Sequence, residues 1–288
     1  AYMAREASDL LRNYSSLSRQ RVMLLTGPAG QGKTHTLVHE VNQILAAGGI
    51  ALGVLGQTLS AADTLWDAIC RRAGWRGTHD QLLDKLENEA ANRNQRALLV
   101  MDALNETPDR RRWRNELAGM IQEVLRRPHL ALAISVRTDY LKQTLPLLPD
   151  GTDTPWVRWE HPGFSGIEPD ALLQYFEHYG VKAPIAPPLG EFGNPLYVQL
   201  LARSMRGHPL QHWLPSWLEV WHAWMARLEE EAKDRLSLDN ASRPEVMRRL
   251  MSKLAQAMLE DGQFNLPRQH ADDLARGMTG VDGVIAFL

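Results

Sequence analysis

The sequence contains one cysteine, Cys70, among its 288 residues. A disulfide within the chain is therefore impossible, a cysteine-rich zinc module is excluded, and a reducing compartment, the cytoplasm, is the expected location. Long apolar runs are missing too: residues 44–55 form the longest weakly polar stretch, but glycines interrupt it and it is too short to span a bilayer. The N-terminus lacks the layout of a signal peptide. These absences argue against a membrane protein and against a secreted one.

An excess of charge of either sign is also missing. The chain has 32 Lys and Arg against 34 Asp and Glu, a formal net charge of −2. No global basic field favours nucleic acid, so a nucleic-acid partner is not expected. Hydrophobic residues make up 44% and charged residues 23%, the proportions of a globular protein. Because the chain begins at Ala1 and stops on an apolar segment, we expect it to be part of a longer polypeptide.

Short apolar runs alternate with helical patterns in the first half of the chain. We expect strands at residues 21–26, 50–55, 96–102, 130–136 and 156–159, and helices at residues 3–17, 32–45, 61–73, 79–93 and 109–127. Strands that alternate with helices need crossover connections, which favour a mostly parallel α/β sheet flanked by helices.

Beyond residue 164 the pattern is helical, apart from a proline-rich break at 184–195. Helices are expected at 213–228 and 244–260, with a hairpin-sized gap at 261–268. Four tryptophans recur at helical spacing, and packing between helices is their expected role. They are Trp213, Trp217, Trp221 and Trp224.

The strongest motif is the segment Gly27–Thr34, which matches the pattern G-x-x-x-x-G-K-[ST] in full. Its glycines let the backbone curl so that successive N–H groups point inward, and the helix that starts there adds its positive end. Lys33 supplies a point charge to the outer phosphates, and the Thr34 hydroxyl can coordinate Mg²⁺. We therefore expect ATP or ADP to bind here with Mg²⁺. The residues expected to line the nucleotide are Gly27, Pro28, Ala29, Gly30, Gln31, Gly32, Lys33, Thr34 and His35.

A P-loop NTPase also needs a carboxylate at the tip of a neighbouring strand to hold Mg²⁺. Asp102 ends the apolar run 98–101 and is the expected second metal residue. Glu106 lies just beyond that strand end, where a group that activates water is needed. Asn105 can orient water but cannot take a proton. We therefore expect Glu106 to serve as the base, with Asn105 assisting.

The fourth expected strand ends in Arg137. An arginine at the carboxyl edge of an α/β sheet points toward the crevice where ligands usually bind. There it would sense or stabilise the γ-phosphate. A surface ion pair with Asp139 or Glu106 is the alternative role.

Together these motifs resemble the STAND branch of P-loop NTPases, relatives of the NACHT and NB-ARC switches. More narrowly, the chain is similar to the ATPase module of the prokaryotic antiviral Avs (AVAST) STAND proteins. The segments that carry the resemblance are residues 21–34, 98–106 with the box DALNE, 135–140 (SVRTDY), 161–164 (HPGF) followed by Glu168, and 191–196 (EFGNPL). The resemblance implies that the strand carrying Arg137 lies between the two motif strands. It also implies that Pro195 of the Gly193-x-Pro195 element packs on adenine.

The resemblance further implies a P-loop NTPase core at 1–165, a helical subdomain at 166–212 and a winged-helix-like subdomain at 213–288. It implies a slow ATPase that acts as a switch: ATP is held, copies of the chain assemble, with a tetramer as the expected form, and an effector is activated. A foreign protein, for instance from a phage, would dock on a sensor. Both the sensor and the fused effector would lie outside this chain.

Two other functions stay open at this stage. An AAA+-like motor or nucleic-acid-dependent ATPase would share the phosphate loop. A nucleotide-locked scaffold would bind ATP without splitting it, and Asn105 motivates this reading because NACHT relatives often carry a second acid at that position.

Overall fold

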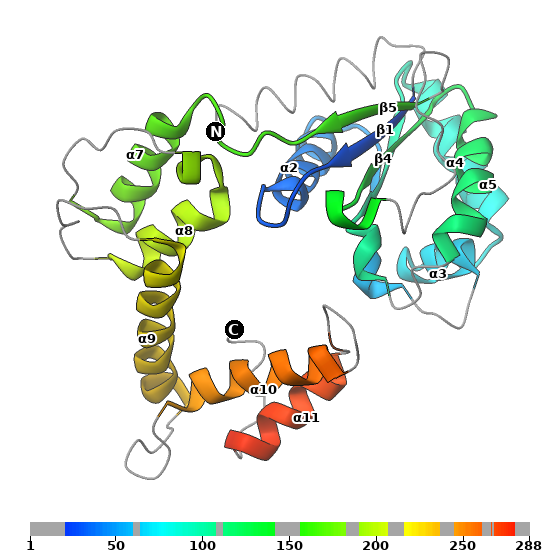
Figure 1. Ribbon diagram of the computed structural model, residues 1–288. Coiled ribbons are helices and arrows are strands. Elements are labelled where there is room, and N and C mark those ends of the chain that lie inside the picture. Colours follow the sequence, from blue (N-terminus) through cyan, green and yellow to red (C-terminus); the bar gives the residue numbers. More distant parts are fainter. Residues whose placement is uncertain are drawn as a thin grey trace. The chain divides into compact units, whose positions relative to one another are not determined.

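The computed structural model describes residues 21–59, 64–107, 112–141, 156–182, 190–206, 216–236, 245–260, 266 and 268–279 (Figure 1). The expected helix at 3–17 lies outside these residues. The described residues form two compact units. The first runs to Ile167 and includes Gly193–Pro195, and the second comprises Glu168–Phe192 and the chain from Leu196 onward. The division into three subdomains stays a prediction.

A five-stranded parallel sheet forms the centre of the first unit, as the alternating pattern predicted. The strands are β1 (Val22–Thr26), β2 (Ala51–Leu55), β3 (Ala97–Asp102), β4 (Leu130–Ser135) and β5 (Trp156–Glu160), in the order β2-β3-β4-β1-β5. All five lie within a residue or two of their expected positions. The order places β4 between β3 and β1, as the family resemblance implied.

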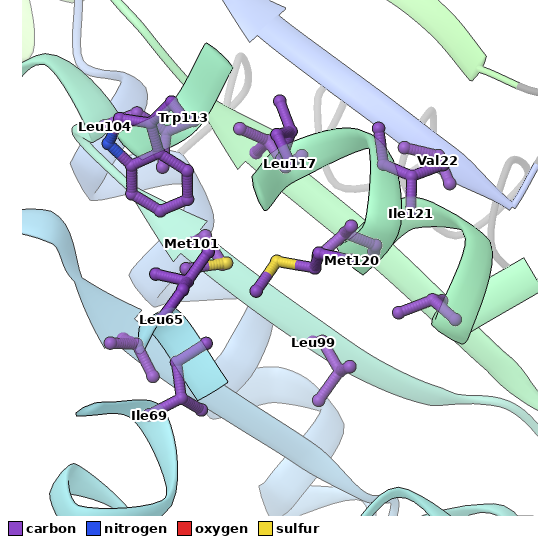
Figure 2. Close-up of a cluster of buried hydrophobic side chains, with 14 of the residues drawn as sticks. Val22, Leu65, Ile69, Leu99, Met101, Leu104, Trp113, Leu117, Met120 and Ile121 are labelled. Carbon is purple, nitrogen blue, oxygen red and sulfur yellow. The ribbon is translucent and has the colours of Figure 1, made fainter. Parts of the chain in front are cut away.

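Alternate residues of the central strands face two different apolar clusters, because successive side chains of a strand point to opposite faces. Val22, Leu99 and Leu132 belong to the larger cluster, which Figure 2 shows in part. Helices α3 (Leu65–Arg72), α4 (His79–Asn92) and α5 (Arg112–Leu125) cover this face. The opposite face, with Leu25 and the small Ala131 and Ala133, is covered by helix α2 (Lys33–Ala46) through Leu37. Burial on both faces explains why these strands are nearly continuous apolar runs.

Local sequence signals set the helix ends in this unit. The Thr64 side chain accepts from the amide of Asp67 at the start of α3, and Thr78 forms a capping box with Gln81 at the start of α4. Trp113, 1% exposed, anchors α5, and its indole Nε1 donates to Thr107 Oγ1 at 2.8 Å. That bond fixes the segment that follows β3. Short 3-10 turns lie at Gly56–Thr58 (η1), Leu104–Glu106 (η2) and Thr138–Tyr140 (η3), each just after a strand.

The described residues of the second unit are mostly helical, as the pattern predicted. The helices are α7 (Glu168–Tyr179), α8 (Pro195–Ser204), α9 (Trp217–Leu236), α10 (Val246–Glu260) and α11 (Arg268–Thr279), with a 3-10 turn at Gly190–Gly193 (η4). Helices α9, α10 and α11 share one apolar cluster that includes Met225, Leu250 and Ala275. The expected hairpin gap falls largely outside the described residues. None of the helices described is long and apolar enough to cross a membrane.

The predicted packing of the tryptophans between helices is confirmed for two of them, and Trp213 lies outside the described residues. Trp224 packs against the apolar cluster, and the Trp217 ring lies 4.8 Å from the ring of Tyr197 on α8. Trp217 and Trp221 nevertheless each keep 37% of their surface exposed. The buried stripe of this helix runs instead through Val220 and Met225. The helix also continues to Leu236, past its expected end at 228. Aromatic spacing therefore predicted contacts between helices but not how deeply each ring of α9 is buried.

Candidate nucleotide site

The phosphate loop connects β1 to α2 and leaves the start of that helix open. The N-cap residue, Gly32, adopts φ 93°, a left-handed conformation that strains any residue with a Cβ. No side chain caps α2 and no acidic residue lies in its first turn. The positive end of the helix dipole is therefore not compensated by its own sequence. Such an N-terminus is suited to an anion.

Lys33 is the charged group of this loop, and only 8% of its surface is exposed. Its Nζ donates to the carbonyl oxygens of Gly27 and Pro28, both at 2.7 Å. Burial, followed by the repulsion of the Arg137 guanidinium, lowers the pKa of Lys33 to about 8. The Lys33 ammonium is thus bound only by neutral carbonyl oxygens, and a negatively charged phosphate would stabilise it much better. The neighbouring Thr34 and His35 are exposed, as are Pro28 and Ala29.

Asp102 ends β3, 2% exposed, and a serine on the neighbouring strand fixes its carboxylate. Ser135 Oγ donates to Asp102 Oδ1 and accepts from the amide of Ala103 at 2.8 Å. Ala103 has φ 55°, an unusual conformation for a residue with a Cβ. The hydroxyl therefore holds both the metal-binding candidate and the strained turn that follows it.

Arg137 and Glu106 form an ion pair, with Nη2 and Oε1 3.0 Å apart. The side chains keep 37% and 32% of their surface exposed, so both remain accessible. Asn105 is 3% exposed, and its Oδ1 accepts from the backbone amide of Arg137 at 3.0 Å. The amide oxygen expected to orient water is therefore engaged in joining η2 to the end of β4.

These charges converge on one place. Arg137 lowers the pKa of Lys33, whereas Asp102, Glu106 and Asp139 raise it, so charged groups that follow β3 and β4 lie near the lysine of the loop that follows β1. The carboxyl ends of parallel strands meet at one edge of the sheet, which is where ligands bind in open α/β folds. The sequence-predicted residues of three separate segments thus lie together.

The fifth strand adds a second wall to the loop. His161 follows β5, and its ring Nε2 lies 2.9 Å from Thr36 Oγ1 in the first turn of α2. In the turn after it, Phe164 donates its backbone amide to the carbonyl oxygen of Gly193 at 2.8 Å. The Gly193-x-Pro195 element is therefore brought to the turn that follows β5. Whether Pro195 packs on a base stays a prediction.

The residues present fit a nucleotide triphosphate with Mg²⁺. The glycine-rich loop leads into a helix whose N-terminus has no side-chain cap, and Lys33 provides a positive charge. Thr34 and Asp102 offer a hydroxyl and a carboxylate oxygen, which are ligands that Mg²⁺ prefers. The binding roles of Gly27–His35, Asp102 and Pro195 stay predictions.

Residues 21–181, more than half of the chain, match the NACHT domain family. The chain belongs to the NACHT family. As a P-loop NTPase of this family, it carries a nucleotide-binding module. No curated protein sequence matches this NACHT chain.

Three solved structures are similar to the chain at low identity. The Walker-type ATPase of Pyrococcus abyssi is 12% identical, with 96% of this chain and 88% of that chain covered and a TM-score of 0.47. Cdc6p of Pyrobaculum aerophilum is 14% identical, with coverages of 96% and 79% and a TM-score of 0.44. The ORC2 protein of Aeropyrum pernix, solved as ADPNP–ADP complexes, is 14% identical, with coverages of 98% and 80% and a TM-score of 0.43.

Sequence reasoning missed the roles of Ser135 and His161 in this NACHT site. Ser135 ends an apolar strand two residues before Arg137 and begins the segment SVRTDY that carries the family resemblance, but neither signal indicates that its hydroxyl binds Asp102. His161 follows a short aromatic strand, and its partner Thr36 is 125 residues away in sequence. No local pattern links the two.

Proposed function

We propose that this NACHT chain is an ATP-operated switch that couples nucleotide state to assembly of the protein. The observation that carries the proposal is the convergence of Lys33, Asp102, Glu106 and Arg137 at the carboxyl edge of the sheet, next to an uncapped helix start. Two cations and three acids, the third being Asp139, lie near this edge and suit a polyanion that arrives with a divalent cation.

Nucleotide binding would replace hydrogen bonds within the protein by bonds to the phosphate groups. The Lys33 ammonium would leave the carbonyl oxygens of Gly27 and Pro28 for phosphate oxygens. Thr34 and Asp102 would hold Mg²⁺, and Ser135 would keep the Asp102 carboxylate in place. When bound, Mg²⁺ supplies neutralisation of the charge on the phosphate oxygens. Pro195 would pack on the base.

Slow hydrolysis follows from the Arg137–Glu106 pair. A base must accept a proton from the water whose oxygen attacks the terminal phosphorus, while the bond to the bridging oxygen breaks. In this proposal Glu106 is the base, although its carboxylate is paired with Arg137. Arg137 would have to turn to the γ-phosphate before Glu106 becomes available. Hydrolysis would therefore require that the Arg137 side chain first leave Glu106. A slow reaction of this kind suits a switch.

The wider biology of the proposal rests on the resemblance to STAND proteins, closest to the antiviral Avs modules. We place the chain in the cytoplasm, where a foreign protein would be detected by a sensor outside this chain. ATP would then favour assembly, with a tetramer as the expected form, and assembly would activate a fused effector. Nucleotide would act by population shift, binding one conformation more tightly than another.

Calorimetry and sedimentation test the proposal directly. Titrating MgATP into the purified chain should give a single site, and Lys33→Ala should abolish the heat without changing the circular dichroism spectrum. Lys85→Ala, at an exposed position of α4, serves as the charge-matched control and should bind normally. Normal ligand-dependent assembly of the Lys33→Ala variant, or no heat from any adenine or guanine triphosphate with Mg²⁺, would contradict the proposal.

The engagement of Glu106 by Arg137 and of Asn105 by the backbone also favours a second candidate, a nucleotide-locked scaffold. Single-turnover hydrolysis separates the two functions. Equal rates for the unmodified chain and Glu106→Ala would leave Glu106 no catalytic role and support the scaffold. Strong stimulation of hydrolysis by DNA or RNA with steep salt dependence would instead support a nucleic-acid-dependent ATPase.

A further inference from the structure

His161 makes three connections from a buried position, 6% exposed. Its backbone amide donates to the carbonyl oxygen of Thr26 at 2.8 Å, which extends the pairing of β5 with β1. The amide of Gly163 donates to its ring Nδ1 at 3.0 Å, and its ring Nε2 lies 2.9 Å from Thr36 Oγ1. Because Nδ1 accepts, the ring hydrogen is assigned to Nε2, which then donates to the threonine hydroxyl.

This imidazole is neutral at physiological pH. Burial, and then the nearby Lys33 ammonium, lower its pKa to about 4. A neutral ring with one assigned tautomer makes one donating and one accepting bond at the same time. Both ring nitrogens are satisfied, so the histidine joins helix α2 to the turn after β5.

The same residue lies against both ends of the phosphate loop. A Cβ built on Gly32 would come within 3.7 Å of His161 Cε1. A Cβ built on Gly27 would come within 3.5 Å of the His161 carbonyl oxygen. A side chain at either glycine would thus touch His161, so His161 lies close to the first and last glycines of the loop. A shift of the loop on nucleotide binding would therefore change the packing around His161.

The turn after His161 contacts the middle of the loop and the Gly193-x-Pro195 element. Gly163 has φ 65°, and a Cβ there would collide with Gln31 Oε1 and with the carbonyl oxygen of Gly193. Gln31 Oε1 is buried and accepts no hydrogen bond from the residues described. Phe164 binds the Gly193 carbonyl through its amide. The turn is thus packed between the phosphate loop and residues 193–195.

Residues 193–195 are also where the chain changes units. They belong to the first unit, whereas Phe192 before them and Leu196 after them belong to the second. Helix α8 begins at Pro195 and continues into the second unit. A displacement of the turn that moves Gly193 would therefore also move the segment of chain that links the two units.

We propose that His161 is a positioning residue that ties the phosphate loop, through Thr36 and the 161–164 turn, to Gly193–Pro195, and so passes nucleotide occupancy to helix α8. The proposal rests on the switch function above and adds the route within this chain. It predicts that ATP slows amide exchange in α8, and that this slowing depends on the ring contact more than the affinity for ATP does.

Two substitutions of His161 each keep one of the two hydrogen bonds of the ring and remove the other. His161→Asn keeps an acceptor near the Nδ1 position for the Gly163 amide but is too short to reach Thr36. His161→Gln keeps a donor near the Nε2 position for Thr36. Thr36→Val removes the hydroxyl with little change in volume, and Thr36→Ser is its matched control because it keeps the hydroxyl.

The test measures MgATP affinity by calorimetry and amide exchange in α8 by mass spectrometry, both on the full chain with ATP at saturation. We expect His161→Asn and Thr36→Val to lose about fivefold or more of the ATP-induced slowing in α8, a larger factor than the loss of MgATP affinity in the same variants. Their double variant should lose no more than either alone, because both remove one contact. His161→Gln and Thr36→Ser should retain most of the slowing.

Three outcomes would overturn the inference: normal slowing in both His161→Asn and Thr36→Val, equal loss in Thr36→Ser and Thr36→Val, or no slowing in the unmodified chain despite ATP binding. If His161→Asn fails to fold, the Thr36 pair alone decides. Failure of the unmodified chain to bind MgATP is a different result, which would remove the proposed function itself.

Discussion

Arg137 Nη2 donates to Glu106 Oε1 at 3.0 Å, so the arginine expected to read a γ-phosphate is paired with the acid expected to activate water. In the proposed switch, each group would hold the other away from a nucleotide. The backbone amide of Arg137 is bound to Asn105 at the same time, which fixes the arginine's backbone but leaves its side chain able to turn. In that proposal, one partly exposed ion pair would oppose both the binding of ATP and its hydrolysis.

Glu106→Gln should therefore separate binding from hydrolysis. Removing the carboxylate charge releases Arg137, so MgATP should bind about two- to fivefold more tightly, the range of a partly exposed ion pair. Loss of the base should lower single-turnover hydrolysis by about 100-fold or more. Glu123→Gln, which removes a carboxylate paired with Arg126 and Arg127 on α5, controls for net charge. Hydrolysis by Glu106→Gln at the original rate would refute the assignment of the base.

The affinity for MgATP should fall at alkaline pH because the pKa of Lys33 is lowered to about 8 by burial and by Arg137. Phosphate stabilises the ammonium, so binding takes up a proton above pH 8, and the association constant should drop by about tenfold per pH unit there. Below pH 8 the lysine is already charged and this dependence should vanish. Calorimetry between pH 6.5 and 9.5 measures it.

Two variants check the assignment to Lys33. In Lys33→Met the weak remaining affinity should no longer depend on pH over the alkaline range. In Arg137→Gln the midpoint should move to higher pH, since a repelling charge is gone. The nucleotide-free protein should show the opposite sign in stability: between about pH 8 and 10.5 the unfolded chain holds a proton that the folded one lacks, so the free energy of unfolding rises with pH. An alkaline drop in affinity that persists in Lys33→Met would point to another group.

Ser135→Ala should weaken the response to Mg²⁺. The Ser135 hydroxyl holds the Asp102 carboxylate and the Ala103 amide, and groups that orient a metal ligand typically contribute 10- to 100-fold to metal affinity. We expect the Mg²⁺ concentration for half-maximal ATP binding to rise by about tenfold. Ser204→Ala on α8, where the hydroxyl binds only a carbonyl of its own helix among the bonds described, is the matched control. An unchanged Mg²⁺ midpoint would leave Ser135 a purely structural role.

Gly163→Ala should disrupt the turn after β5 far more than Gly166→Ala. Both glycines have left-handed φ, 65° and 86°, so both variants suffer backbone strain of about 1 kcal/mol. Only at Gly163 does the added Cβ also meet Gln31 Oε1 and the carbonyl oxygen of Gly193; at Gly166 nothing lies within 4 Å. Thermal unfolding and MgATP titration of the two variants compare these costs. Equal losses would show that the turn does not pack as described.

Much of the first unit could be predicted because its signals are local. The apolar runs that became β1, β3 and β4 are bounded by glycine or polar residues, and each strand is buried on both faces. The phosphate loop follows from glycine spacing, and Gly32 indeed takes a conformation that other residues avoid. The tryptophans of α9 show the limit: helical spacing tells which residues share a face but not how much of each is covered, because Trp217 packs on Tyr197 and still keeps 37% of its surface exposed.

The sequence by itself determined the parallel α/β core, the phosphate loop and the identity of the charged residues at the sheet edge, because backbone conformation and side-chain burial in single segments follow from neighbouring residues. Only the tertiary structure decided which side chains bind each other. The pairs are Ser135 with Asp102, Arg137 with Glu106, and His161 with Thr36. These partners are 33, 31 and 125 residues apart, and only the order of strands in the sheet brings them within hydrogen-bond distance.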